Sequence, residues 1–273
     1  MRALAEGEAK IRVAGLRHYY RSNDGGQVPA LQDVSFDVAE GEMVTVVGPS
    51  GCGKSTLIHL IAGLIRPAAG DLLVDGRRVR GPGSDRGVVF QELAILPWRT
   101  ARRNIGHGLE IAGVPGPERD RIVARYIDLV GLRGFEDRYP HELSGGMKQR
   151  VAVARTLAAD PKVILMDEPF AAVDAQTRIT LQEELLRISV VTKKTILFVT
   201  HSVDEAVFLG DRVMVLTRRP GTVKESVVVP LPRGGRSWDA VNHDGRFLEV
   251  RDHVLQSVRA EVTGPQAAPA ASR

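Results

Sequence analysis

The chain has 273 residues, 43% of them hydrophobic and 26% charged, which is enough for one large domain or two small ones and excludes a globally disordered chain. The 37 Lys and Arg residues against 33 Asp and Glu residues leave a net charge of +4, too small to predict a nucleic-acid partner. No apolar run approaches about 18 residues, so no transmembrane helix is expected. The first ten residues lack the apolar core of a signal peptide, and the single cysteine, Cys52, fits a reducing cytosol. The sequence therefore predicts a cytoplasmic chain.

The N-terminal part is predicted to contain strands followed by a glycine-rich loop. Residues 1–9 show no periodicity and predict a flexible end. Hydrophobic runs and alternation predict strands at Ile11–Leu16, Leu31–Val38 and Met43–Val47, with a turn at Ser22–Gly26. The loop Gly48–Gly53 comes next, followed by an apolar helix pattern at about Lys54–Ile65. Strand, glycine loop and helix in this order are typical of the opening of a parallel α/β sheet.

The middle of the chain changes from strand to helix periodicity. Two further strands are expected at Asp71–Val74 and Gly87–Phe90. Between about Glu92 and Asp160 the β-branched runs stop. The apolar residues from Ile122 to Val130 recur with the spacing of one helix face. This block predicts a helical insertion in the α/β domain.

The C-terminal part returns to alternating strands and helices. Strands are expected at Val163–Met166, Thr195–Thr200, Arg212–Leu216 and Thr222–Val229. Helices are expected at Ala175–Val191, Val203–Leu209 and Asp239–Val262. The last residues, 263–273, are rich in Ala and Pro and predict disorder.

The glycine-rich loop carries the strongest local motif. Gly48-Pro-Ser-Gly-Cys-Gly-Lys54-Ser55 matches G-x-x-x-x-G-K-[ST] between a predicted strand and a predicted helix. The glycines allow backbone N–H groups to face phosphate oxygens, and the helix N-terminus favours the same anion. We expect Lys54 to neutralise the β- and γ-phosphates and Ser55 to bind Mg²⁺. The alternative is a chance glycine-rich turn. Cys52 lies close to the helix N-terminus, which predicts a lowered thiol pKa.

A pair of acids follows a buried strand. Asp167 and Glu168 come directly after the apolar run Val163–Met166, where ligands bind in open α/β sheets. We expect Asp167 to bind Mg²⁺, through water, and Glu168 to act as general base for the attacking water. Without the phosphate loop, two adjacent acids at a solvated loop end would be the better interpretation.

Further motifs resemble those of one family, the ATP-binding-cassette (ABC) ATPases. Leu143-Ser-Gly-Gly-Met147 resembles the family signature, usually L-S-G-G-Q. Val89-Phe-Gln91, Ala172-Val-Asp174 and Val199-Thr-His201 resemble its Q-loop, D-loop and switch histidine. Tyr20 resembles the aromatic that stacks on adenine, although its neighbour Tyr19 leaves that choice open. Six motifs in the family's order argue against a chance match.

The resemblance implies the fold. It runs from about Ile11 to Val229 and implies an α/β P-loop NTPase cassette with an antiparallel β subdomain, a RecA-like parallel-sheet core and an inserted helical subdomain. The implied division is a flexible N-terminus at 1–9, an ABC ATPase domain at 10–230 with the helical subdomain at about 92–160, a C-terminal helical extension at 231–262 and a disordered tail at 263–273.

The resemblance also implies the site residues and cofactors, which are ATP and Mg²⁺. The implied catalytic residues are Glu168, His201 and Gln91. The implied ATP-binding residues are Tyr20, Gly48, Pro49, Ser50, Gly51, Cys52, Gly53, Lys54, Ser55, Thr56, Ser144, Gly145, Gly146 and Asp174. The implied Mg²⁺ ligands are Ser55, Gln91 and Asp167. In this family each signature faces the γ-phosphate bound by the opposite subunit, so ATP brings two cassettes together.

Three features resemble one importer branch, the nitrate/sulfonate/taurine group. They are Met147 in place of the signature Gln, Leu96-Pro-Trp-Arg99, and Arg218-Arg-Pro-Gly221. A thioether cannot donate a hydrogen bond, so a contact of the usual Gln with ribose is expected to be lost while the backbone amides remain. Trp98 has two interpretations, a core aromatic or an anchor on a surface that receives a permease.

The branch implies an ATP-hydrolysing subunit that energises import of a small solute, an anion of that type. Its implied partners are a second copy in a homodimer, transmembrane permease subunits and an extracytoplasmic solute-binding protein, with no nucleic acid. Its implied location is the cytoplasmic face of the inner membrane. The alternative is a non-transport ABC ATPase in DNA repair or translation, which usually carries a long coiled coil, zinc-binding cysteines or two cassettes. A P-loop kinase or GTPase would leave the signature unexplained, and N-K-x-D is absent.

Overall fold

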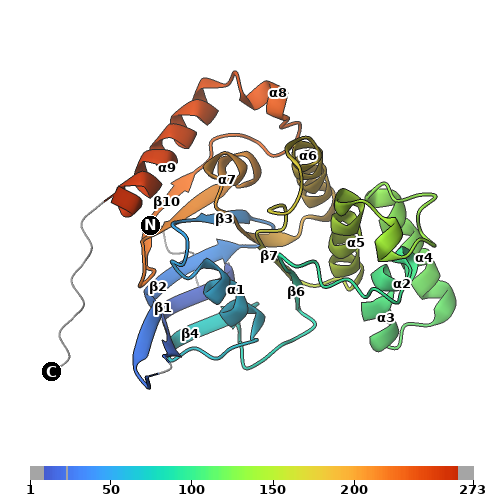
Figure 1. The fold of residues 1–273 in the computed structure, drawn as a ribbon, viewed down its shortest axis with the longest axis horizontal. Coiled ribbons are helices and arrows are strands. Elements are labelled where there is room, and N and C mark those ends of the chain that lie inside the picture. Colours follow the sequence, from blue (N-terminus) through green and yellow to red (C-terminus); the bar gives the residue numbers. More distant parts are fainter. Residues whose placement is uncertain (1–8, 23, 264–273) are drawn as a thin grey trace.

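The computed structural model describes residues 9–22 and 24–263, which form two sheets and a set of helices (Figure 1). The antiparallel sheet has the order β2-β1-β4-β5. Its strands are β1 (Ala9–Arg21), β2 (Gln27–Ala39), β4 (Ala69–Val74) and β5 (Arg77–Arg78). The other sheet has the order β10-β9-β3-β8-β7-β6 and is parallel except at the β10 edge. Its strands are β3 (Met43–Val47), β6 (Arg86–Val89), β7 (Val163–Asp167), β8 (Thr195–Val199), β9 (Arg212–Leu216) and β10 (Val223–Val228).

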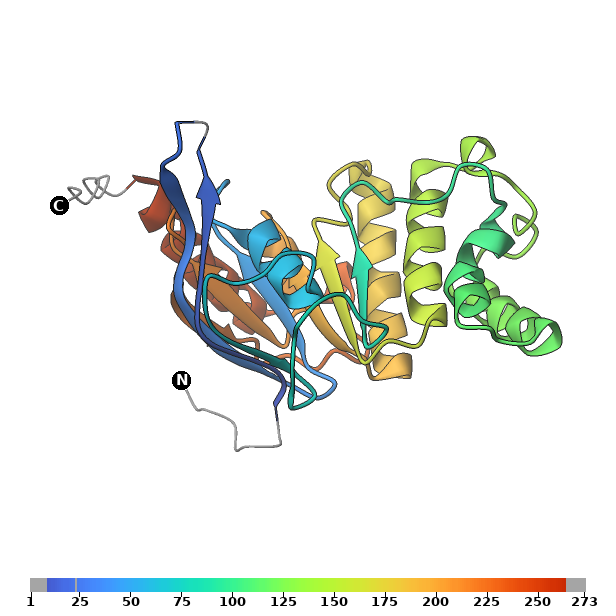
Figure 2. The same ribbon diagram turned by 90° about the horizontal axis from the view of Figure 1, so that it is seen from below.

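The helices fall into three groups. α1 (Lys54–Ala62) lies between the two sheets, and the opposite face of the parallel sheet carries α6 (Ala175–Thr192), α7 (Val203–Leu209) and α9 (Gly245–Thr263), with α8 (Trp238–Val241) ahead of α9 (Figure 1). A helical block contains α2 (Ala101–Ile105), α3 (His107–Ile111), α4 (Gly116–Leu129), a 3₁₀ turn (Pro140–Glu142) and α5 (Gly145–Ala158). Figures 1 and 2 both place this block at one end of the molecule and the antiparallel sheet at the other. None of the helices in the described ranges is long and apolar enough to cross a membrane.

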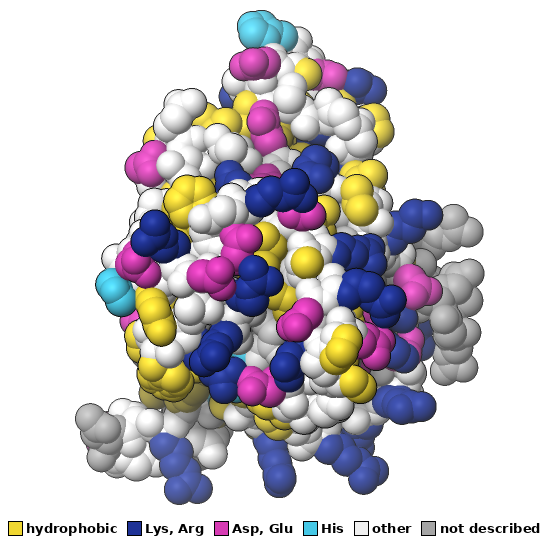
Figure 3. Space-filling view, turned by 90° about the vertical axis from the view of Figure 1, so that its right-hand side faces the viewer, with side chains coloured by type: hydrophobic (Ala, Val, Ile, Leu, Met, Phe, Trp, Pro, Cys, Tyr) yellow, Lys and Arg dark blue, Asp and Glu magenta, His cyan; other side chains and the backbone are white. Residues whose placement is uncertain are grey.

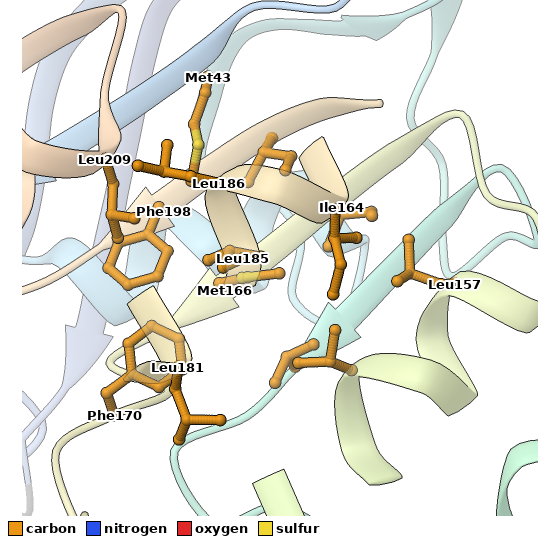
Figure 4. Packing of buried hydrophobic residues seen from close by; sticks show 14 of the residues in the cluster. Met43, Leu157, Ile164, Met166, Phe170, Leu181, Leu185, Leu186, Phe198 and Leu209 are labelled. Atoms are coloured by element: carbon orange, nitrogen blue, oxygen red, sulfur yellow. The ribbon is translucent and has the colours of Figure 1, made fainter. Parts of the chain in front are cut away.

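The central strands are buried on both faces because consecutive side chains point to opposite sides of the sheet. In β3, Val44 and Val46 join the cluster around α1, whereas Met43 and Val47 join the cluster on the other face. Figure 4 shows this second cluster, in which Met166 of β7 and other strand residues pack against α6. The α6 side chains labelled there are Leu181, Leu185 and Leu186. The continuous apolar runs of the sequence are therefore strands of this doubly covered sheet.

Most predicted elements are confirmed, with differences at their ends. β1 and β2 are longer than predicted, and the short β5 was not predicted. α1 ends at Ala62 rather than Ile65, because Gly63 adopts a left-handed φ of 77° and caps the helix. A Cβ at Gly63 would lie 2.2 Å from the carbonyl oxygen of Gly81, so only glycine fits this close approach.

The predicted last helix, Asp239–Val262, is wrong as a single helix. α8 ends at Val241 and α9 begins at Gly245. Between them, the Asp244 carboxylate accepts a hydrogen bond from the backbone N–H of Arg246 at 2.9 Å, a local contact that competes with continued helix. The predictions for residues 1–8 and for the tail after Thr263 lie outside the described residues.

Candidate active site

The glycine-rich loop between β3 and α1 encloses the ammonium group of Lys54. Lys54 Nζ donates hydrogen bonds to the carbonyl oxygens of Gly48 at 2.9 Å and Pro49 at 3.1 Å. Gly53 has a left-handed φ of 106°, and a Cβ there would lie 2.6 Å from Leu31 Cδ2. Within the described residues no side chain caps α1, so its first N–H groups are available to an anion. The loop thus combines a buried cation with a helix N-terminus.

The predicted low pKa of Cys52 is wrong. Its side chain is buried in the apolar cluster around α1. Burial raises the pKa of the Cys52 thiol because the thiolate loses water, and the nearby Lys54 charge offsets this only in part. The position of Cys52 near the start of α1 suggested a low pKa, but the sequence does not show that its side chain points into the apolar cluster. Cys52 contributes to the loop through its backbone, with its N–H bonded to Pro49 O at 3.3 Å.

Ser55 and Asp167 bring two oxygen ligands together. The Ser55 hydroxyl donates to Asp167 Oδ1 at 3.1 Å, which joins α1 to the end of β7. Burial raises the pKa of the Asp167 carboxyl, and the hydrogen bond from Ser55 lowers it. A buried carboxylate next to a hydroxyl is a donor set that suits a hard divalent cation such as Mg²⁺. The residues present therefore fit the metal that the motif predicts.

Glu168 and His201 form a second pair beside the first. His201 Nδ1 lies 2.9 Å from Glu168 Oε2. Glu168 has a φ of 44°, unusual for a residue with a side chain, and its backbone N–H donates to Val199 O at 3.0 Å. Strained conformations of this kind are typical of functional sites. The left-handed turn directs the Glu168 side chain across to the loop after β8, where His201 lies.

Tyr20, rather than Tyr19, reaches the phosphate-loop helix. The Tyr20 hydroxyl lies 3.1 Å from Thr56 Oγ1, and its ring packs edge-on against His18 with centroids 4.9 Å apart. Tyr20 stays 41% exposed, so part of its ring is open to a ligand. Strand alternation directs the neighbouring Tyr19 to the opposite face of β1.

The signature residues lie on a different surface, at the start of α5. Ser144 caps α5 by accepting the Met147 N–H at 3.2 Å. Asp174 caps α6 in the same way, accepting the Thr177 N–H at 3.0 Å, and this bond lowers the pKa of its carboxyl. Gly146 of α5 lies directly against Thr177 of α6, since a Cβ on Gly146 would lie 2.6 Å from Thr177 Cγ2. The signature and the D-loop are thereby packed against each other, and no described hydrogen bond links them to the Ser55–Asp167 pair.

Three further predicted features are at least partly exposed. Gln91 is exposed just after β6, and the described hydrogen bonds include none from Gln91 to Ser55 or Asp167. Met147 packs partly buried against the core cluster that includes α5. Trp98 is 70% exposed, which excludes its interpretation as a core aromatic.

Sequence reasoning missed a set of buried polar residues behind His201. Thr200, Glu205 and Gln182 are 1%, 6% and 3% exposed and are hydrogen-bonded to one another. No clear signal marks them in the sequence, because Glu205 stands beside a second acid, Asp204, in the first turn of α7, where acids are common. Gly221 was also not predicted to touch the site. A Cβ there would lie 2.1 Å from Cys52 O, so the loop after β9 packs directly on the phosphate loop.

This arrangement defines a class of protein. The phosphate loop follows β3. His201 follows β8, the strand next to β3, and Asp167 and Glu168 lie at the end of β7, the strand after that in the same parallel sheet. Ligands of open α/β sheets bind at that carboxyl edge. A buried lysine in a glycine loop, with an acid pair at the same edge, is the architecture of a P-loop nucleotide hydrolase.

Comparison with known proteins identifies the family. Residues 31–171 match the model of the ABC transporter family. The chain is 51% identical to the nitrate import ATP-binding protein NrtD of Synechocystis, over 87% of this chain and 91% of that protein. It is 47% identical to the taurine import ATP-binding protein TauB of Roseobacter denitrificans, over 91% of this chain and 93% of that protein.

A solved structure is similar as well. It is the ATP-binding cassette MJ0796 in a dimeric, post-hydrolysis state bound to ADP and Pi, with a TM-score of 0.71 and 29% identity over 81% of this chain and 100% of that one. The chain therefore belongs to the ABC transporter family and is one of its ATP-binding, ATP-hydrolysing cassettes. The predicted fold and ATPase activity are confirmed.

Proposed function

We propose that the chain is the ATP-hydrolysing subunit of a membrane importer for a small solute, an anion of the nitrate/sulfonate/taurine type. The observation that carries the ATPase chemistry is the meeting of the Ser55–Asp167 and Glu168–His201 pairs at one sheet edge, next to Lys54. The import role is supported by the high identity to proteins named for nitrate and taurine import.

Each residue of this edge has a proposed task. Ser55, Asp167 and Gln91 would hold Mg²⁺, whose charge would neutralise the phosphates. Lys54 and the backbone N–H groups of residues 48–56, apart from Pro49, which has none, bind the β- and γ-phosphates. Tyr20 stacks on the base. Glu168 takes a proton from water as the water oxygen attacks the γ-phosphorus and the bond to ADP breaks. His201, held against Glu168, orients that carboxylate and contacts the γ-phosphate.

The signature surface completes the site of a second copy. Ser144, Gly145 and Gly146 begin α5 with backbone amides that suit a phosphate, but they lie away from this chain's own phosphate loop. We propose a homodimer in which these residues and Asp174 face ATP bound to the opposite cassette. The proposed division of labour is an ATPase domain at 10–230, a helical subdomain at about 92–160 that receives the permease, and an extension at 231–262.

The helical end of the molecule is the proposed permease surface. Trp98 is exposed beside an open groove that Arg99, Arg102 and Arg103 also line. Figure 3 shows this end of the molecule, where basic and acidic side chains alternate around hydrophobic ones. An exposed aromatic within a charged rim is a common interface anchor. The proposed setting is the cytoplasmic face of the inner membrane, with an extracytoplasmic solute-binding protein delivering the solute.

The test is reconstituted transport. The chain is reconstituted in liposomes with the permease and binding protein of a nitrate importer or of a taurine importer, and ATP-driven uptake of nitrate and of taurine is measured. We expect uptake of one such anion by the wild-type complex. Trp98→Ala should leave the ATPase activity of the free subunit unchanged but lower uptake at least about tenfold, since an aromatic anchor that becomes buried on docking contributes about 2 kcal/mol or more. The matched control is Ile111→Ala, another exposed apolar side chain of the helical block, which lies outside this groove. ATP hydrolysis without uptake of any anion would contradict the import role.

A further inference from the structure

A buried polar chain connects the C-terminal segment to the residue before His201. Trp238, the first residue of α8, donates its indole N–H to Gln182 Oε1 at 2.9 Å. Gln182, in α6, donates its amide N–H to Glu205 Oε1 at 2.6 Å. The other carboxylate oxygen of Glu205 accepts the Thr200 hydroxyl, and Thr200 directly precedes His201. This polar chain, Trp238–Gln182–Glu205–Thr200, links side chains of the three helices α8, α6 and α7 to the residue before His201.

Glu205 holds the backbone around His201 from both sides. Its carboxylate accepts the Thr200 hydroxyl, while Thr200 Oγ1 accepts the Ser202 N–H at 3.0 Å. Its own backbone N–H donates to Ser202 Oγ at 3.3 Å. No cationic side chain in the described ranges forms an ion pair with Glu205. Burial raises the pKa of its carboxyl. The hydrogen bonds from Thr200 and Gln182 oppose that shift most strongly, and the nearby charges of Arg178 and His201 oppose it less.

The Trp238 end of the polar chain is held against α7 by ring packing and by hydrogen bonds from Arg236. Trp238 stacks on Phe208 with centroids 4.2 Å apart and planes 10° apart, and Phe247 of α9 meets the indole edge-on at 6.1 Å. Arg236 is buried and donates to the carbonyl oxygens of Phe208 at 2.6 Å and Gly210 at 3.1 Å, at the end of α7. The indole N–H therefore reaches Gln182 from a segment that is packed against and hydrogen-bonded to α7, the helix that follows His201.

We propose that the C-terminal segment, through Trp238 and the polar chain, sets the position of His201 against Glu168. Trp238, Gln182 and Glu205 are positioning residues, because none of them is in contact with the nucleotide-binding loop. The inference rests on the role proposed above for His201. The inference gives α8 and α9 a part in ATP turnover. Without the indole donor, the Gln182 side chain can rotate and no longer holds the Glu205 carboxylate. The backbone of residues 200–202, and with it His201, can then move.

The experiment separates hydrogen bonding from packing. Trp238→Phe keeps an aromatic ring on Phe208 but removes the donor. Phe247→Leu loosens the same apolar contact and leaves the donor in place. For the purified full chain we expect Trp238→Phe to lower kcat about fivefold, the effect of one neutral hydrogen bond, with KM for ATP within about twofold. Phe247→Leu is expected to lower the melting temperature but to keep wild-type kcat well below it.

A double-mutant cycle tests whether the two ends act together. Glu205→Gln is expected to lower kcat between about tenfold and hundredfold, again with little change in KM. Adding Trp238→Phe to it should lower kcat no further, because the connection is already broken. Wild-type kcat in Trp238→Phe, or effects of the two changes that multiply, would overturn the inference.

One reference variant distinguishes failure of this inference from failure of the proposed function. His201→Ala should abolish nearly all turnover whatever the role of Trp238. If His201→Ala is inactive while Trp238→Phe is normal, the inference fails and the proposed role of His201 stands. If His201→Ala hydrolyses ATP at the wild-type rate, the role on which the inference rests is itself wrong.

Discussion

Gly146 lies where the signature helix meets α6, and adding a single methyl group there tests that contact. A Cβ on Gly146 would lie 2.6 Å from Thr177 Cγ2, well inside van der Waals contact. Gly145, one residue earlier, has no atom within 4 Å of the same added Cβ. The pair Gly146→Ala and Gly145→Ala therefore makes the same chemical change in a crowded and an open position of one helix.

The size of the effect follows from two opposing terms. Overpacking costs about 1–3 kcal/mol, and replacing Gly by Ala in a helix returns up to about 1 kcal/mol, less in the first turn. A net cost of about 1.5 kcal/mol corresponds to a melting temperature about 3–6 °C lower for a chain of this size. Gly145→Ala carries only the helix term, so its expected change is zero or a slight increase.

The assay is thermal unfolding of the purified chain followed by circular dichroism. Thr177→Ser removes Cγ2 but keeps the hydroxyl, so it should restore most of the stability lost in Gly146→Ala when the two are combined. Equal melting temperatures for Gly146→Ala and Gly145→Ala, or no recovery in the double variant, would refute the proposed contact between the two helices.

The remaining predictions concern the nucleotide site. Lys54→Ala should weaken ATP binding at least about tenfold in an equilibrium titration, because a charged hydrogen bond to phosphate is lost, and normal affinity would contradict the phosphate-loop role. Ser144→Arg should prevent ATP-driven dimerisation, measured by light scattering after size exclusion, by filling the opposite γ-phosphate site; a dimer that still forms with ATP argues against the composite site. Cys52 should react with iodoacetamide at least about ten times more slowly in the folded chain than in urea, because burial raises its pKa and blocks access, and equal rates would disprove that burial.

Local sequence patterns predicted the core of the fold well. β3, β9 and α7 have the predicted ends, because each is an apolar run bounded by turn or cap residues. The position of Asp167 and Glu168 at the end of β7 was also predictable, since an acid after a buried strand must emerge at the sheet edge.

The features that could not be predicted depend on contacts between residues far apart in the sequence. The end of α1 at Gly63 depends on a backbone approach from Gly81, which is distant in the chain. The burial of Cys52 depends on the sheet that covers α1, so reasoning from the helix N-terminus alone gave the wrong direction for its pKa. The polar chain behind His201 combines side chains from positions 182 to 238, and no local spacing relates them.

The central claim is that Glu168 activates water for ATP hydrolysis at this edge, and Glu168→Gln tests it most directly. The change keeps the shape of the side chain and the Ser55–Asp167 pair but removes the base. Steady-state hydrolysis by the purified chain with Mg²⁺ should fall between about 10² and 10⁴-fold, while the ATP dissociation constant stays within about threefold. Hydrolysis near the wild-type rate in Glu168→Gln would contradict the account.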